Sequence, residues 1–154
     1  MRVEFINPFI SAVSMTFETM ASISVKRLSP VLKKNPQTLH PISGIIGLSG
    51  SVVGTVILTM SEPVAIKAAS VMLMDELHEI NEDVLDAVGE LTNIVAGSAK
   101  NQLEEFKLSL SLPNVISGSN AEVRFPDESQ PITIPFETDF GPLAIEVGFS
   151  EKTR

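Results

Sequence analysis

The stretch that most limits what this chain can fold into is its β-branched run from Ser43 to Met60, SGIIGLSGSVVGTVILTM. Valine, isoleucine and threonine favour strands because their branched side chains pack well on a pleated surface. Ser49-Gly50 interrupts the run near its middle, which is typical of two strands joined by a tight turn that needs positive φ. The run therefore predicts an antiparallel hairpin that the rest of the domain has to cover.

Three helices are expected around this hairpin. Asn7-Pro8 has the pattern of a helix start, because asparagine caps helices and proline is tolerated in the first turn. Ser61-Glu62-Pro63 opens a second helix. Asn81-Glu82-Asp83 opens a third, with acidic groups where the helix dipole favours them. Apolar residues recur at helical spacing after each of these starts.

The other strands are predicted from short runs. Apolar and polar side chains alternate from Phe106 to Leu112, and Pro113 ends that strand. Segments 33–41 and 115–120 are expected to be loops. Further strands are predicted at SISVKRLS (22–29), AEVRF (121–125), ITIPF (132–136) and LAIEVGF (143–149). The order α-β-β-β-α-α-β-β-β-β indicates one α+β domain over residues 1–154, with a mostly antiparallel sheet and helices packed on one face.

Charge and composition exclude several classes of protein. The net charge is −8, whereas a protein that binds the phosphate backbone needs an excess of lysine and arginine, so no nucleic-acid partner is expected. The chain has no cysteine for disulfide or thiolate chemistry. No apolar run approaches the ~20 residues of a membrane helix, and the N-terminus lacks a signal-peptide pattern, so a cytoplasmic location is expected. The basic cluster is interpreted as a solvated strand end and loop: Lys26, Arg27, Lys33 and Lys34.

The third predicted helix has faces of different character. One buried stripe is expected at Val84, Val88, Leu91, Val95 and Ser98. A neighbouring stripe of mostly small residues lets another element approach closely: Leu85, Gly89, Thr92, Ala96 and Ala99. The remaining face carries Asp86, Glu90, Asn93, Gly97 and Lys100.

On that remaining face, Glu90 and Asn93 project side by side, because residues three apart lie about 60° apart around the helix axis. Gly97 leaves bare backbone one turn further on. Glycine inside a helix costs roughly 1 kcal/mol relative to alanine, so a glycine here indicates a surface shaped for a partner. The alternative is an ordinary solvated face, since Glu and Asn three residues apart are common on exposed helices.

The stretch DAVGELTNIVAGSAKNQLE (86–104) resembles the conserved helix of the CheC/CheX/FliY phosphatases of bacterial chemotaxis. Glu90 and Asn93 match the acid and the amide of the family's E-x-x-N signature, and Gly89 and Gly97 match its flanking glycines. The hairpin before this helix, LPNVISG after it and the closing FGPLAIEVGF occur in the family's order. The signature occurs once, which is typical of the CheX type.

The resemblance implies that the protein dephosphorylates the aspartyl phosphate of a CheY-like response regulator. It implies that Glu90 pairs with the regulator's active-site lysine and that Asn93 positions the attacking water. Asp86, Gly97 and Lys100 are expected to contact the regulator from the same face. Mg²⁺ would be held by the regulator, so no cofactor or metal of the chain's own is expected. The resemblance also implies a homodimer joined through sheet strands, for which the β-branched hairpin could offer an edge.

Two alternatives stay open at this point. The chain could instead be a non-catalytic module that docks a regulator, or a scaffold of a signalling pathway, and a buried or blocked Asn93 would favour that reading. His40 and His78 could bind a metal together with nearby carboxylates. Without cysteine or an H-x-x-x-H spacing, however, they are expected to be surface histidines.

Overall fold

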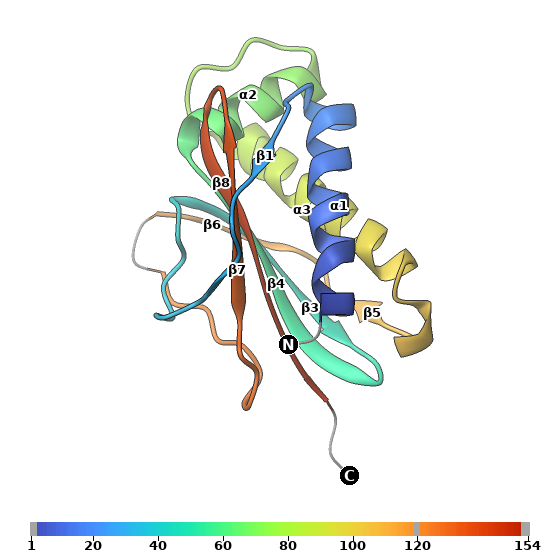
Figure 1. The fold of residues 1–154 in the computed structure, drawn as a ribbon. Helices are drawn as coiled ribbons and strands as arrows, with labels where there is room; N and C mark the ends of the chain where they lie inside the picture. The colour runs from blue at the N-terminus through green and yellow to red at the C-terminus, as the bar shows by residue number, and fades with distance from the viewer. Residues whose placement is uncertain (1–2, 119–120, 152–154) are drawn as a thin grey trace.

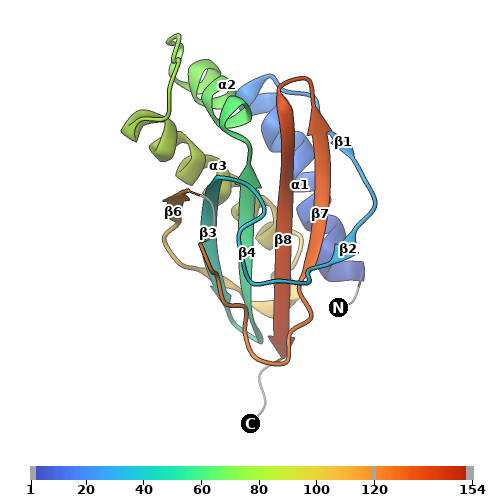
Figure 2. The same cartoon turned by 90° about the vertical axis from the view of Figure 1, so that its left-hand side faces the viewer.

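The computed structural model describes residues 3–118 and 121–151, and it is an α+β domain of two layers. Three helices cover one face of an antiparallel sheet, and loops cross the other face (Figures 1 and 2). The helices are α1 (Val3–Ala21), α2 (Glu62–Leu73) and α3 (Glu82–Asn101). The strands are β1 (Lys26–Arg27), β2 (Val31–Leu32), β3 (Ile42–Ser49), β4 (Val52–Met60), β5 (Ser109–Leu110), β6 (Asn114–Ser117), β7 (Ile132–Thr138) and β8 (Gly141–Glu151).

The β3–β4 hairpin lies in the interior of the sheet. The strand order is β1-β7-β8-β4-β3-β5, with β2 also paired to β7 and β6 also paired to β3. The predicted α+β class and the antiparallel hairpin are therefore confirmed. The suggestion that this hairpin offers a free sheet edge is wrong, because β4 has β8 on its other side and β3 has β5 and β6.

The turn of this hairpin contains glycine for a different reason than the sequence suggested. Among the described glycines, positive φ occurs at Gly118 and Gly141, not at Gly50. A Cβ on Gly50 would lie 2.6 Å from the carbonyl oxygen of Phe106, and the same oxygen accepts a 2.9 Å hydrogen bond from Ser51 N–H. Gly50 is therefore required by the close approach of the chain that follows α3.

Helices α2 and α3 begin where the sequence predicted. Ser61 precedes α2 with proline in its first turn, and the Asn81 side chain accepts a 2.9 Å hydrogen bond from Val84 N–H at the start of α3. The predicted start of α1 is wrong, because the helix begins at Val3 and contains Pro8.

The early start of α1 is explained by burial of its aromatic residues. Pro8 cannot donate the hydrogen bond that its place in the helix calls for. Phe5, which lies upstream of Pro8, is nonetheless buried, and its ring contacts the rings of Phe106 and Phe149 at centroid distances of 4.8 Å and 5.2 Å. Burying an aromatic side chain stabilises by about 1.5–3 kcal/mol, which is enough to offset one lost hydrogen bond.

The segment between α3 and β7 departs most from the prediction. The expected strand 106–112 is instead a short 3-10 turn (Glu104–Phe106) followed by the two residues of β5. The expected loop 115–120 contains most of β6, and residues 119–120 lie outside the described ones. Segment 121–125 contributes one isolated bridge, from Glu122 to Gln37, and segment 22–29 keeps only β1. Lys107 takes a left-handed φ of 50°, which ends the 3-10 turn and interrupts the alternating pattern.

The sheet face opposite the helices carries a buried ion pair. Lys33 Nζ donates to the two carboxylate oxygens of Glu146 at 3.0 and 2.9 Å and to the carbonyl of Gln37 at 2.7 Å. The Lys33 side chain is only 7% exposed, so the prediction of a wholly solvated basic cluster is wrong for this residue. The ion pair holds segment 33–41 against β8. None of the helices in the described part of the chain is long and apolar enough to cross a membrane.

Candidate docking surface on α3

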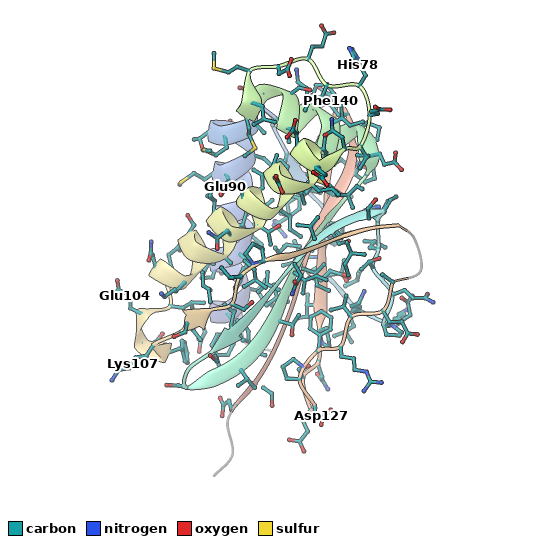
Figure 3. The ribbon with its side chains drawn as sticks, turned by 180° about the vertical axis from the view of Figure 1, so that it is seen from behind. His78, Glu90, Glu104, Lys107, Asp127 and Phe140 are labelled. Atoms are coloured by element: carbon teal, nitrogen blue, oxygen red, sulfur yellow. The ribbon has the colours of Figure 1, made fainter. Side chains whose placement is uncertain are left out.

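The outer face of α3 presents Glu90 and Asn93 to solvent. Both residues are exposed, whereas Val88, Leu91 and Val95 on the opposite side are fully buried. This division confirms the predicted buried stripe at Val84, Val88, Leu91 and Val95, whereas its last member, Ser98, is half-buried. Figure 3 labels Glu90 on α3, which lies in front of α1 in this view.

The stripe of small residues fixes how closely α3 sits on the sheet. Gly89, Thr92, Ala96 and Ala99 are all buried, and Leu85, the fifth member of the stripe, is half-buried. A Cβ on Gly44 of β3 would overlap the Thr92 hydroxyl, so the glycine in the strand makes room for the threonine in the helix. The Thr92 hydroxyl donates to the carbonyl of Val88 at 2.7 Å and is thus satisfied inside α3. These contacts hold the polar face of the helix in a fixed direction.

Beside this face lies a groove of about 710 Å³ between α3 and β6. Its helix side comes from α3 and its strand side from the segment that enters β6. The lining residues are Glu82, Leu85, Asp86, Gly89, Glu90, Asn93, Pro113 and Val115. The proposed acid and amide therefore stand at the wall of a concave surface rather than on a convex helix.

The structure brings three of the predicted site residues into the groove, namely Asp86, Glu90 and Asn93. Gly97 and Lys100 lie beyond it along α3. A Cβ on Gly97 would have no atom within 4 Å, so this position is open, and Lys100 is half-buried in the last turn of the helix.

Sequence reasoning missed both residues on the strand side of the groove, and on the helix side it did not predict Glu82 and Leu85 as site residues. Pro113 was interpreted only as the end of a strand, and Val115 was placed in a loop. Since β6 forms by pairing with β3, which is distant in sequence, helical or strand periodicity carries no signal for this wall. The stretch LPNVISG could have indicated this wall, because it follows the signature helix in the order typical of the family.

The two histidines lie in different surroundings. His78 is exposed, with Nε2 3.9 Å from a carboxylate oxygen of Glu76. His40 is half-buried, and burial lowers its pKa, an effect that the negative charge of Glu146 partly opposes. Over the described residues, no three His, Cys, Asp or Glu side chains are grouped to hold a metal ion.

The fold is an antiparallel sheet covered by helices, and α3 carries an exposed carboxylate and amide at the wall of a groove. Residues 42–137 match the family model described as chemotaxis phosphatase CheX. Since the match spans more than half of the chain, the protein belongs to the CheX family.

Known members of this family are similar over most of their length. The CheY-P phosphatase CheX of Thermotoga maritima is 28% identical over 127 residues, which are 80% of this chain and 82% of that protein. The crystal structure of the chemotaxis protein CheX from Vibrio vulnificus is 35% identical, with a TM-score of 0.87 over 96% of this chain and all of that one. CheX from Borrelia burgdorferi, solved as a complex with CheY, BeF3 and Mg²⁺, is 26% identical with a TM-score of 0.80, over 97% of this chain and all of that one.

Proposed function

We propose that the protein hydrolyses the aspartyl phosphate of a CheY-like response regulator, and that α3 presents Glu90 and Asn93 to the regulator's active site. The observation that carries the proposal is the joint exposure of this pair at the wall of one groove, in a member of the CheX family. Two relatives support the choice of substrate: one is named as a CheY-P phosphatase, and the other was crystallised with CheY.

Asn93 is proposed to position the attacking water. Its amide can accept a hydrogen bond from water and donate one to a phosphate oxygen, and it brings no negative charge close to the anion. The water oxygen forms a bond to phosphorus while the bond from phosphorus to the aspartyl oxygen breaks, which yields inorganic phosphate and a free carboxylate. Because an acyl phosphate is already reactive, positioning and electrostatics can supply most of the rate.

Glu90 is proposed to fix the regulator on α3 through its active-site lysine. Among the described residues of this chain, no ion pair or hydrogen bond engages the Glu90 carboxylate, so it is available to a partner. Asp86, Gly97 and Lys100 are proposed to contact the regulator along the same helix. Mg²⁺, held by the regulator's own carboxylates, would neutralise charge on the phosphoryl group.

The exposure of Asn93 also bears on the alternative of a non-catalytic module. A scaffold could bury this amide or cover it with a loop without loss, whereas a phosphatase has to leave it accessible. Asn93 lies exposed in the groove wall, which favours turnover.

A single-turnover assay with a phosphorylated CheY-like regulator tests the proposal. The wild-type protein should accelerate phosphate loss, and Asn93→Ala should lower the rate by about 100-fold or more, because a misplaced nucleophile costs at least that much. Binding to a regulator activated with beryllium fluoride should change little. Asn7→Ala, an exposed asparagine of α1, is the matched control. Full activity of Asn93→Ala would refute the water-positioning role.

We also propose that the protein is a homodimer, as the resemblance implied. The proposed contact is not the β3–β4 hairpin but the sheet edge formed by β1 and β2, where Val31 and Leu32 are exposed. An edge strand with exposed apolar side chains favours association with another chain.

A further inference from the structure

The groove has a second wall that the proposed roles of Glu90 and Asn93 leave without a function. β6 pairs with β3 as part of the sheet and packs against α3. A Cβ on Gly89 would lie 3.3 Å from Val115 Cγ2 and 3.9 Å from Pro113 Cγ. Gly89 therefore lets α3 lie close to β6, since a side chain there would crowd Val115, and the strand side of the groove carries the apolar side chains of Pro113 and Val115.

The residue before this wall is an exposed leucine. Leu112 is 86% exposed, although it directly precedes Pro113 in the groove. Single exposed apolar residues are ordinary on protein surfaces. Here, however, the residue that follows it lines the groove together with Val115 and the half-buried Leu85.

The helix side of the same groove is acidic. Glu82, Asp86 and Glu90 follow one another at four-residue intervals and all line the groove. They span about 12 Å of helix at 1.5 Å per residue. Within the described part of the chain, none of the three forms an ion pair. Three like charges in a row favour an approaching surface that carries positive charge.

We infer that the β6 wall, defined as Leu112, Pro113 and Val115, is a recognition surface for the regulator and acts together with the acidic row Glu82, Asp86 and Glu90. The inference rests on the proposed function, because Asn93 lines the same groove and the occupant must be the molecule whose phosphoryl group reaches it. The regulator segment that fits carries an apolar side chain next to a lysine or arginine. The apolar side chain packs on the wall and the cation lies along the row.

The apolar part is tested with Leu112→Ser and Val115→Thr. Leu112→Ser alters an exposed side chain, and Val115→Thr keeps a β-branched shape, so both variants should fold. Leu112→Ser should raise the KM for the phosphorylated regulator, and the Kd for a regulator activated with beryllium fluoride, about tenfold. The kcat should stay unchanged, because contacts made equally before and during the reaction affect only KM. Leu39→Ser, a half-exposed leucine of segment 33–41, is the control and should leave both constants unchanged.

The charged part is tested by the dependence of association on salt. The double variant Glu82→Gln, Asp86→Asn should bind the activated regulator more slowly at low salt and should show a shallower decrease of the association rate as salt rises. Asp127→Asn with Glu128→Gln is the matched control, since Asp127 lies at the lower end of the molecule in Figure 3, away from α3 and Glu90.

Three outcomes would overturn the inference. Wild-type KM and Kd in both Leu112→Ser and Val115→Thr, alongside normal turnover, would show that the wall does not touch the regulator. An unchanged salt dependence in the acidic double variant would show that no lysine or arginine of the regulator lies along the acidic row. Conversion of a dimer to a monomer by Leu112→Ser would assign the wall to a second copy of this chain. If instead the wild type fails to hydrolyse the phosphoryl group, the proposed function fails, while titration with the activated regulator still tests the wall.

Discussion

Glu90 and Asn93 stand three residues apart on one exposed face, yet they are expected to act at different stages of the reaction. The carboxylate carries a full charge and can attract a lysine before contact, whereas the amide acts only once water and phosphorus are in place. Their contributions should therefore separate into binding and turnover.

Glu90→Ala should weaken binding of the activated regulator by roughly 1.5–3 kcal/mol, which is typical of a hydrogen bond to a charged group. Glu90→Lys should weaken it further, because it places like charges opposite each other. Titration with a regulator activated by beryllium fluoride measures both effects. If Asn93→Ala loses as much affinity as Glu90→Ala, the pair serves as a docking patch and the separation of roles is wrong.

His40 should make the stability of the fold depend on pH. Burial lowers the pKa of His40 below its ordinary 6.5, with partial opposition from Glu146. The unfolded chain therefore binds a proton at higher pH than the folded one, so the stabilising contribution is present above 6.5 and is lost as pH falls below it. Urea unfolding at about pH 7.5 and about pH 5.5 should show a larger loss for wild type than for His40→Gln. Equal losses in the two proteins would contradict this expectation.

At the scale of the element, the glycine at position 97 lowers the stability of α3 but leaves its outer face without a protruding side chain. Gly97 has open space where a side chain would stand. Gly97→Leu should keep or raise the free energy of unfolding, by up to about 0.8 kcal/mol from helix propensity. It should weaken regulator binding, since the added bulk lies on the approach surface, and Gly97→Ala should have a smaller effect on binding. Thermal unfolding and the same titration decide this. Loss of folding in Gly97→Leu would show that the glycine is needed for packing.

The course of α3 was predictable from sequence because its signals are local. Asn81 caps the helix, the stripes repeat within the segment, and the E-x-x-N pair falls on the face that these stripes leave free. The start of α1 was not predictable in this way, since Phe5 stabilises helix upstream of Pro8 by contacts with Phe106 and Phe149, which are distant in sequence.

The segment after α3 shows why half of the groove was missed. Apolar and polar residues alternate from 106 to 112, as in a strand. The backbone conformation there is instead determined by the left-handed φ of Lys107 and by the hydrogen bond from Ser51 N–H to the carbonyl of Phe106. Residues 114–117 begin and end with a polar residue, so their sequence gives little indication of a strand. They form β6 nonetheless, because they pair with β3. Strand formation there depends on a partner distant in sequence, and intrinsic preference is a weak guide to such pairing.

At the scale of the whole molecule, the proposed docking surface and the proposed dimer contact lie on different sides. Figure 2 shows β1 and β2 at one edge of the sheet and α3 with β6 toward the other. Segment 33–41 is fastened across the sheet by the Lys33–Glu146 pair and links this edge to β3. A dimer through β1 and β2 would therefore leave both grooves open to regulators.

This arrangement gives the last prediction, which concerns assembly. Val31 and Leu32 are 53% and 61% exposed on β2, and such an edge is expected to be covered by a second chain. The wild type should sediment as a dimer at micromolar concentration, and Leu32→Lys should shift it toward monomer by placing two like charges in the contact. Leu73→Lys, at the end of α2, is the control for an added charge at an exposed leucine. Because the groove lies elsewhere, the single-turnover rate per protomer of Leu32→Lys should equal that of wild type. A wild-type monomer at these concentrations would reject the dimer and leave the α3 surface unaffected, whereas loss of turnover on dissociation would show that the second copy supports the site.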